Sequence, residues 1–332
     1  MWRVMGFPLN CLMKMTGCLP VKQSLKESYM SQYKTPQVGI FKEGSHHFYF
    51  LEYGLNSSDR LQVKQAITEC LDVISNVSVV VSFGEEAWRF LQPNWMPETF
   101  KSFEPLQGLQ GHQAPSTQAD LFFWLHGEDI STVLDVALMI HTKIKRVGHL
   151  RLQERGFSYH QNKDLIGFED GTANPETDEL KRDAAVIADG RMGAGGSLIL
   201  TQKWVHNLDK WNATPVPCQE AVIGRTKEEN IELEGDDMPD DSHISRTDLT
   251  VAGVPMKIYR RSAPFGSVTE NGLLFLAFGC ELIRFTSQLE SMYGLTEDKK
   301  IDQLLNFSKA VTGSYWFAPS EEDLSEMLNR DV

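Results

Sequence analysis

Residues 165–175, LIGFEDGTANP, contain the acidic side chains best placed to do chemistry in this sequence. Asp170 stands between Gly167 and Gly171, and glycines let the backbone approach a flat, bulky group closely. A carboxylate held beside such a group can accept a proton and return it. The competing interpretation is an ordinary turn, because Asp-Gly and Asn-Pro are common turn dipeptides. The stretch by itself leaves both interpretations open.

Histidine is the second residue type that can carry chemistry here, as a metal ligand. The nine histidines form no H-E-x-x-H or H-x-x-x-H pattern, so a zinc site of that spacing is not expected. Two candidates are worth considering, His206 in KWVHNLDKW and His243 in DDSHISRTD. A lone histidine more often forms a structural hydrogen bond than binds a metal, and spacing does not separate these two.

Two adjacent arginines, Arg260 and Arg261, lie at the end of a predicted strand at residues 256–261. Successive side chains of a strand point to opposite faces, so one arginine can enter a pocket while the other faces away. Pro264 and Gly266 then predict a sharp turn. The alternative is two surface arginines, and the pattern does not decide between them.

The first half of the chain predicts the order strand, helix, strand, strand, helix, strand. Residues 38–55 and 77–83 are rich in aromatic and branched side chains, which favour strands. Residues 57–76 follow Ser-Ser-Asp and carry apolar residues at helical spacing. A strand at 120–127 and a helix at 130–145 come next. This order is typical of a ferredoxin-like α+β unit.

The second half repeats that order around a long polar insertion. We predict strands at 195–205, 256–261, 272–280 and 314–318 and helices at 281–293 and 302–311. The fold expected is therefore α+β, with tandem duplicated ferredoxin-like domains built on antiparallel sheets. We predict these segments: a poorly ordered N-terminal extension at 1–36, an N-terminal domain at 37–160, a C-terminal domain at 161–320 and an acidic tail at 321–332.

Charge and hydropathy exclude two classes of partner. The formal net charge is −13, and no basic stripe is present to neutralise phosphates, so we expect no nucleic-acid binding. No window approaches the 18 or more apolar residues of a membrane span, so we expect no membrane partner. The acidic surface favours cationic over anionic small molecules.

The cysteines indicate the compartment. The five are scattered, odd in number and contain no C-x-x-C pair, which favours a reducing environment over a disulfide framework. Near the N-terminus, Pro8 and Lys14 interrupt the apolar stretch that an export signal would need. We therefore expect a cytoplasmic protein.

Taken together, several motifs resemble the dye-decolourising peroxidase family, over nearly the whole chain from Val38 to Pro319. The family signature G-x-x-D-G stands here at residues 167–171 and continues to Pro175. Other matching segments resemble those of one compact bacterial branch of the family, the cytoplasmic porphyrinogen peroxidases. These segments are VIGRTKEENIEL (222–233), DDSHI, the R-R-S-x-P-F-G run and FSKAVTG (307–313). The resemblance implies paired ferredoxin-like domains of the dimeric α+β barrel type, with haem held mostly by the second.

The resemblance also implies a role for each matching residue on the iron-binding side. His243 corresponds to the histidine that binds the iron, which leaves His206 with a structural role. The family places an acid behind that histidine to accept its second N–H. Asp302 is the candidate here, although Asn306 occupies a nearby position where relatives carry Asp.

On the opposite side of the haem, the resemblance places the peroxide-handling residues. Asp170 corresponds to the family's aspartate and Arg260, rather than Arg261, to its arginine. Ser262 stands where the family often has Asn or Ser, and it could hydrogen-bond a peroxide-derived oxygen or a water. The residues expected to contact the haem itself are Gly167, Gly171, Arg260, His243 and Asp302.

The activity implied is a haem b peroxidase that reduces hydrogen peroxide through a ferryl intermediate. It would oxidise dyes, phenols or porphyrinogens as single-electron donors. An ordinary aspartate is ionised at neutral pH and can act as the base, while an arginine stays cationic and stabilises the charge that develops on the O–O bond. The branch usually forms dimers or larger rings, so we expect a homo-oligomer.

Two alternatives use the same fold. A haem-handling protein would bind porphyrin to remove or deliver iron without peroxidase turnover, and only turnover data distinguish it. A haem-binding sensor is the second. It is disfavoured by the carboxylate and the arginine together, because a sensor needs no group that moves a proton.

Overall fold

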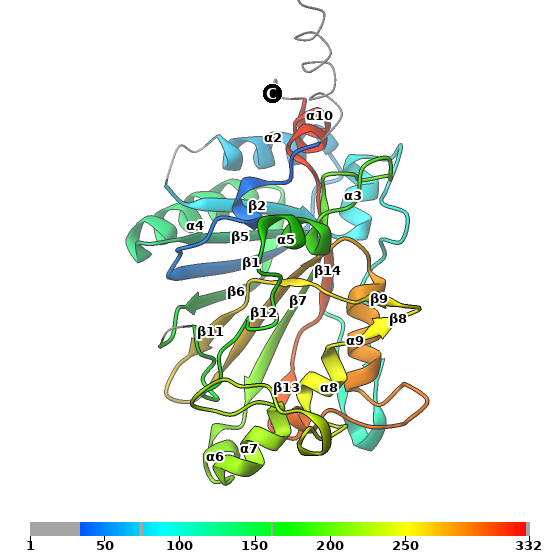
Figure 1. Cartoon of the computed structure of the whole chain (residues 1–332). Coiled ribbons are helices and arrows are strands. Elements are labelled where there is room, and N and C mark those ends of the chain that lie inside the picture. The colour runs from blue at the N-terminus through cyan, green and yellow to red at the C-terminus, as the bar shows by residue number, and fades with distance from the viewer. Residues whose placement is uncertain (1–33, 73–75, 161, 330–332) are drawn as a thin grey trace, which may run out of the picture. The chain divides into compact units, whose positions relative to one another are not determined.

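The first half of the chain folds around one four-stranded antiparallel sheet with the strand order β2-β5-β1-β6 (Figure 1). The computed structural model describes residues 34–72, 76–160 and 162–329, so most of the predicted extension at 1–36 lies outside it. Two helices connect the strands in the β-α-β-β-α-β order of a ferredoxin-like unit. The elements are β1 (His47–Leu55), α2 (Arg60–Leu71), β2 (Ser78–Phe83), β5 (Leu121–Gly127), α4 (Ile130–Ile144) and β6 (Gly148–Phe157).

Local sequence explains where these helices begin and which faces they bury. The Asp59 side chain accepts hydrogen bonds from the N–H groups at the start of α2, and Asp129 does the same for α4. In α4, buried apolar residues recur at helical spacing from Val133 to Ile144. In β1, alternate side chains such as Tyr49 and Leu51 belong to the core that includes both helices, while Phe48 and Phe50 belong to a second core on the other face.

The second half repeats the arrangement with the strand order β10-β12-β7-β14. Every pair of these neighbouring strands is antiparallel, which confirms the predicted α+β class with antiparallel sheets. The bounds are β7 (Ser197–His206), β10 (Tyr259–Arg260), β11 (Ala263–Gly266), β12 (Asn271–Gly279), α9 (Ile283–Met292) and β14 (Ser314–Ala318). The long polar insertion expected between β7 and β10 contains three short helices, α6 (Leu208–Asn212), α7 (Val216–Ile223) and α8 (His243–Thr247).

The two halves share one continuous sheet. Strand β14 of the second half pairs with β2 of the first, with Phe317 opposite Phe83. Between the halves lies a core of aromatic and aliphatic side chains from both, including Phe122, Ile199 and Trp316. The division into domains at 37–160 and 161–320 remains a prediction, since the sheet runs across it.

The strands of the second half have one face against the core between the halves, and the opposite face positions the site. Along β7, Ile199 packs into the core between the halves, whereas Leu200, Gln202, Trp204 and His206 line a cavity on the other face. Strand β12 adds Leu273 and Phe275 to that wall. Short β13 (Ser308–Ala310) pairs with the end of β7 and extends this wall.

Three of the predicted elements are wrong. Residues 302–311 do not form a helix: Asp302 caps a short 3₁₀ turn, η4 (Gln303–Asn306), and β13 then pairs with β7. The start of the stretch 38–55, which was expected to form strands, is a 3₁₀ turn, η1 (Val38–Ile40), and the strand predicted at 256–261 shortens to β10. In each case the presence or absence of a neighbouring strand to pair with overrides the secondary structure that the local sequence favours.

The remaining elements are short. Within the predicted acidic tail, α10 begins at its Ser320 cap and buries Leu324, Met327 and Leu328. No helix in the described part of the chain is long and apolar enough to cross a membrane. The short elements that complete the chain are α3 (Glu85–Leu91), β3 (Leu106–Gln107), η2 (Leu109–Gly111), β4 (Gln113–Ala114), α5 (Asp178–Ala185), η3 (Gly235–Asp237), β8 (Thr250–Val251), β9 (Val254–Pro255) and α10 (Glu321–Leu328).

Candidate functional site

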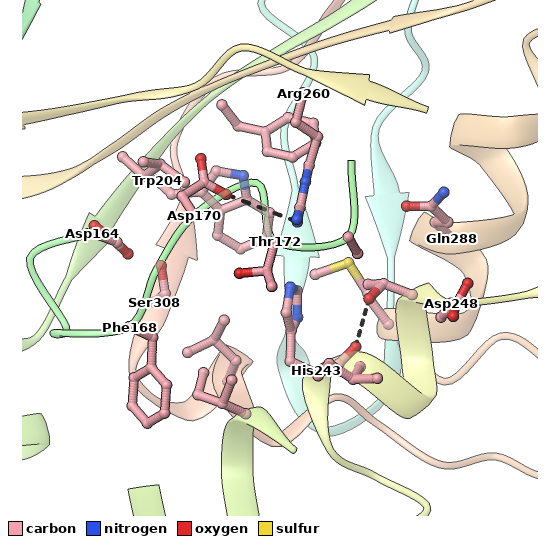
Figure 2. Close-up of a pocket in the computed structure, with 18 of the residues that line it drawn as sticks. Asp164, Phe168, Asp170, Thr172, Trp204, His243, Asp248, Arg260, Gln288 and Ser308 are labelled. Carbon is pink, nitrogen blue, oxygen red and sulfur yellow. Dashed lines mark hydrogen bonds and ion pairs between the residues drawn. The ribbon is translucent and has the colours of Figure 1, made fainter. Parts of the chain in front are cut away.

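The site is a cavity on the face of the second half's strands that points away from the core between the halves (Figure 2). Strands β7 and β12 form one wall, and helices α8 and α9 and the loop at 164–173 contribute the others. Most of the lining is apolar, and polar groups enter at a few points. Apolar lining residues include Ile223, Ile244, Met256, Ile258, Phe285 and Leu289. The cavity suits a large and mainly apolar ligand with a few polar attachment points.

His243, the first residue of α8, enters this cavity with one ring nitrogen already occupied. Its Nδ1 lies 2.6 Å from Oδ2 of Asp302, a fully buried carboxylate whose Oδ1 also accepts from the Leu304 N–H at 2.8 Å. Because a carboxylate only accepts, Nδ1 carries the proton and the lone pair of a neutral imidazole lies on Nε2. Nε2 has no partner among the described residues, and Figure 2 shows the ring extending into the cavity. Asn306, the alternative to Asp302, bonds instead to Gln303.

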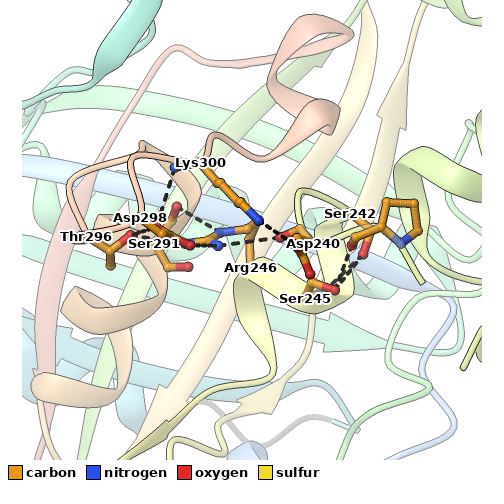
Figure 3. A network of polar contacts seen from close by, with 9 residues as sticks. Asp240, Ser242, Ser245, Arg246, Ser291, Thr296, Asp298 and Lys300 are labelled. Atoms are coloured by element: carbon orange, nitrogen blue, oxygen red, sulfur yellow. Dashed lines mark hydrogen bonds and ion pairs between the residues drawn. The ribbon is translucent and has the colours of Figure 1, made fainter. Parts of the chain in front are cut away.

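A polar network holds α8, and with it His243, in place (Figure 3). Arg246, one turn along the helix and 6 % exposed, donates to Asp298 at 2.7 Å and to Thr296 at 3.0 Å. It also donates to the backbone carbonyl of Ser291 in α9. The hydrogen bonds from Arg246 and Thr296 lower the pKa of the Asp298 carboxyl from its ordinary value. At the helix start, the Ser242 hydroxyl accepts from the Ser245 N–H.

Asp170 and Arg260 lie on the other side of the cavity from His243 (Figure 2). Oδ1 of Asp170 and Nη1 of Arg260 are 3.9 Å apart, and both side chains are about four-fifths buried, with exposed fractions of 20 % and 21 %. A carboxylate and a guanidinium attract each other at this distance. A proton acceptor and a fixed cation therefore face the free nitrogen of His243.

The loop at 164–171 places Asp170 through its own backbone. The N–H of Asp164 donates to the Phe168 carbonyl at 2.8 Å, and the N–H of Asp170 donates to the Asn162 carbonyl at 3.0 Å. Gly167 and Gly171 have φ values of 90° and 83°, which side chains rarely adopt. Neither glycine lines the cavity, although their neighbours do. Their role in the described structure is to shape the loop.

The backbone of Arg260 is held by the same loop. The Asn174 side chain donates to the Arg260 carbonyl at 2.9 Å and accepts from the Arg260 N–H at 2.8 Å. Arg261 points away from the cavity and donates to the carbonyls of Ile40 and Lys42, both at 2.7 Å. The two arginines thus face opposite sides, and Arg260 is the one in the cavity.

Ser262 is not brought to the site with the other candidates. It is not among the residues that line the cavity, and its Oγ lies 3.4 Å from the Leu276 N–H, which donates to it. The strand register explains this, because the chain leaves β10 after Arg260 and re-pairs with β12 as β11. Ser262 therefore sits in the join between two short strands.

His206 lines the same cavity but has no free ring nitrogen. Its Nδ1 lies 2.8 Å from the Ser308 hydroxyl, and its Nε2 lies 3.0 Å from Oδ2 of Asp164. Binding a metal through either nitrogen would break one of these buried bonds. The geometry therefore distinguishes His206 from His243, which spacing in the sequence does not.

The residues present fit a haem. A flat, apolar group suits the walls, and the free Nε2 of His243 is the kind of single ligand that haem iron takes. The amide nitrogen of Gln202 is buried in the wall without a hydrogen-bond partner in the described structure, and so is available to a bound group. No three His, Cys, Asp or Glu side chains in the described ranges gather to hold a bare metal ion.

Three residues with roles at this site were not picked out from the sequence. Asn174 was interpreted as a turn residue, and Asp164 and Gln202 were not singled out. For Gln202 a signal existed, because it is the polar member of the alternate positions Leu200, Gln202 and Trp204 in an apolar strand. For the other two, only the fold shows which distant atoms they meet.

Comparisons with known proteins agree with this site. Residues 40–158 match the family model described as Dyp-type peroxidase, N-terminal, and residues 161–323 match Dyp-type peroxidase, C-terminal. The chain is 32% identical over 253 residues to a dye-decolorizing peroxidase of Rhodococcus erythropolis, covering 75% of this chain and 74% of that protein. Deferrochelatases are more distant: one from Shigella flexneri is 29% identical and covers 50% of this chain.

Solved structures are also similar. A putative dyp-type peroxidase protein from Shewanella oneidensis superposes with a TM-score of 0.82 at 34% identity, covering 90% of this chain and 99% of that one. A variant of DypB from Rhodococcus jostii RHA1, solved in complex with heme, gives a TM-score of 0.81 at 29% identity. That match covers 88% of this chain and 99% of the other.

Proposed function

We propose that this chain, which belongs to the Dyp-type peroxidase family, works through His243 on one side of its haem and through Asp170 and Arg260 on the other. It is a haem peroxidase that uses hydrogen peroxide, with haem b as its cofactor. The observation that carries the assignment of residues is geometric. The free Nε2 of His243 faces the Asp170–Arg260 pair across one apolar cavity.

His243 would hold the haem iron through Nε2. The Asp302 carboxylate fixes the ring orientation and the tautomer, and it makes Nε2 a stronger electron donor. The apolar walls would enclose the macrocycle and exclude water, and the Gln202 amide could donate a hydrogen bond to the loaded site. When bound, the haem supplies the redox centre that accepts electrons from donors and passes them to peroxide.

Asp170 would take one proton from hydrogen peroxide and return it to the oxygen that leaves as water. The Arg260 guanidinium lies 3.9 Å from the carboxylate that would accept this proton. The guanidinium would also stabilise negative charge on the peroxide oxygens as the O–O bond breaks. Asn174 and the strand pairing of β10 keep this cation in place.

The reductants are small single-electron donors, and dyes, phenols and porphyrinogens are the proposed classes. The acidic surface supports a preference for neutral or cationic donors, because the net charge of −13 attracts cations and repels anions. A turnover series with matched cationic and anionic dyes at low and high salt tests this preference. If salt leaves the ratio of the two rates unchanged, charge does not select the donor.

We also propose that the protein forms a homo-oligomer, dimeric or larger, and that it is located in the cytoplasm. Ile130, Leu134 and Leu138 support self-association, because they follow each other at four-residue spacing on α4 with exposed side chains. Light scattering of the purified protein, compared with Leu138→Lys, tests it. A wild type that stays monomeric would refute the oligomer. The scattered cysteines support a reducing compartment.

The assignment of site residues is tested by pairing each variant with a matched control. We expect Asp170→Asn to keep its haem but to react with peroxide at least about 100-fold more slowly. Glu169→Gln, which alters the adjacent and exposed carboxylate, should react at the wild-type rate. His243→Ala should lose or weakly hold haem, unlike His149→Ala at an exposed histidine. Wild-type peroxide kinetics in Asp170→Asn would remove Asp170 from the mechanism.

The haem-handling alternative is not favoured. The deferrochelatases that match are distant and cover about half of this chain. Because the same fold and ligands would serve a haem-handling protein, turnover with hydrogen peroxide is the measurement that distinguishes the two.

A further inference from the structure

His206 links two parts of the structure that lie far apart in the sequence. It ends β7, and its imidazole bonds to Asp164 on one side and to Ser308 on the other. The side chains of His206 and Asp164 are 4 % and 9 % exposed, and Ser308 is 4 % exposed. Since the Asp164 carboxylate only accepts, Nε2–H donates to it, while Nδ1 shares a hydrogen bond with the Ser308 hydroxyl.

At the first end, Asp164 opens the loop that carries Asp170. Its N–H donates to the Phe168 carbonyl and its own carbonyl accepts from the Gly167 N–H, so the residue forms the base of the loop. The Asp164 side chain is bonded only to the Leu165 N–H and to His206 among the contacts described. A buried carboxylate that lost the imidazole would be left without its main donor.

At the second end, Ser308 follows the segment that supports His243. Ser308 lies directly opposite His206 in the β13–β7 ladder. The preceding turn, η4, is capped by Oδ1 of Asp302, and Oδ2 of the same carboxylate holds Nδ1 of His243. The Asn207 N–H donates to the Phe307 carbonyl at 2.7 Å, which ties the end of β7 to the same segment. In Figure 2, Asp164 and Ser308 lie on the same side of the cavity.

We propose that His206 is a positioning residue that ties the Asp170 loop to the segment carrying Asp302, so that both sides of the haem site keep a fixed separation. The proposal rests on the proposed roles of Asp170 and His243. The imidazole suits this task because it is rigid and bonds in two directions from one ring. A flexible or apolar side chain would satisfy one end at most.

Hydrogen–deuterium exchange of the full chain tests the link, in both its haem-loaded and haem-free forms. In His206→Leu we expect amides of residues 162–171 and of 302–308 both to exchange about tenfold or more faster than in the wild type. His126→Leu is the matched control, because His126 is also buried and bonded at both nitrogens, to Ser45 and Gly39. It should leave both segments unchanged beyond any global effect.

Two further variants keep the test decisive if His206→Leu does not fold. In Ser308→Ala, only residues 302–308 should exchange faster, because the bond to Asp164 remains. In His206→Gln, the amide can still donate to Asp164, so protection at 162–171 and the peroxide rate should recover together. Faster exchange in both segments of His206→Leu, with this partial recovery, supports the proposal.

Other outcomes overturn it. Unchanged exchange in His206→Leu, a response in one segment only, or the same response in His126→Leu each shows that His206 does not link the two sides. If Asp170→Asn reacts normally with peroxide, the proposed function fails instead, while the exchange data on haem-free protein still decide the role of His206.

Discussion

Asn174 holds Arg260 by both of its backbone polar groups, with its amide nitrogen 2.9 Å from the Arg260 carbonyl oxygen and its amide oxygen 2.8 Å from the Arg260 nitrogen. The two residues are 86 positions apart in the chain. This contact takes the place of a second neighbouring strand for β10, whose one ladder partner among the described residues is β12. It also joins the loop that carries Asp170 to the strand that carries Arg260, so the positions of the two side chains depend on each other.

Replacement of Asn174 by Ala should therefore lower the rate of reaction with peroxide. Both hydrogen bonds are lost, and at about 1 kcal/mol each the backbone of Arg260 gains freedom to leave Asp170. We expect a decrease of about tenfold in the second-order rate constant, measured by stopped-flow absorbance, with haem content unchanged. Asn306→Ala, at an exposed asparagine whose side chain donates to Gln303, is the control. Equal rates in both variants would show that the clamp is not needed.

Replacement of Asp302 by Asn should change the electronic character of the haem site more than its occupancy. The amide oxygen can still accept from Nδ1 of His243, but the negative charge that makes the imidazole a stronger donor is gone. We expect a more positive iron reduction potential, measured by spectroelectrochemistry, and a loss of about 10- to 100-fold in activity. A potential equal to that of the wild type would show that Asp302 only positions the ring.

Replacement of Gln202 by Met, which has a similar shape, should affect the haem-free and haem-loaded forms differently. The unpartnered amide nitrogen in the cavity wall costs about 1–3 kcal/mol, so Gln202→Met should raise the free energy of unfolding of the haem-free chain. In the loaded protein the gain should shrink or reverse, because the amide then has a partner. Urea unfolding of both forms measures this. Equal gains in the two forms would show that Gln202 makes no bond in the loaded site.

Stability should fall as pH rises because of Glu52, a fully buried acid in the core between the halves. Burial raises its pKa from 4.5 to about 8, against a weaker opposing effect of the hydrogen bond from Thr201. A raised folded-state pKa means that the unfolded chain loses the proton first. The free energy of unfolding is then highest below about pH 4.5 and decreases toward pH 8, by up to about 1.4 kcal/mol per pH unit for this group.

Glu52→Gln should remove this dependence, since an amide does not titrate. Urea midpoints of the wild type and the variant, taken at several values between pH 5 and 8, measure the difference. Glu228→Gln, at an exposed glutamate, should keep the wild-type slope. If Glu52→Gln follows the same slope as well, Glu52 is not the group responsible.

The sequence by itself determined the α+β class, the order of the main elements and the chemical types at the site. Runs of aromatic and branched residues located β5 and β12, and helical spacing of apolar residues located α4, to within a few residues. Local patterns failed at residues 302–311, where the Asp302 cap and pairing of β13 with β7 decide the structure. The motif around Asp170 was visible because it is continuous in the chain.

The family resemblance pointed to His243 rather than His206, but only the tertiary structure gives the physical reason. Both are single histidines without a ligand-like partner at a metal-binding spacing, so spacing in the sequence does not separate them. Their partners lie far away: Asp302 is 59 positions from His243, and Asp164 and Ser308 are 42 and 102 positions from His206. What a histidine can do depends on which of its nitrogens are already bonded in the folded chain. That choice is made by long-range contacts, which no local pattern contains.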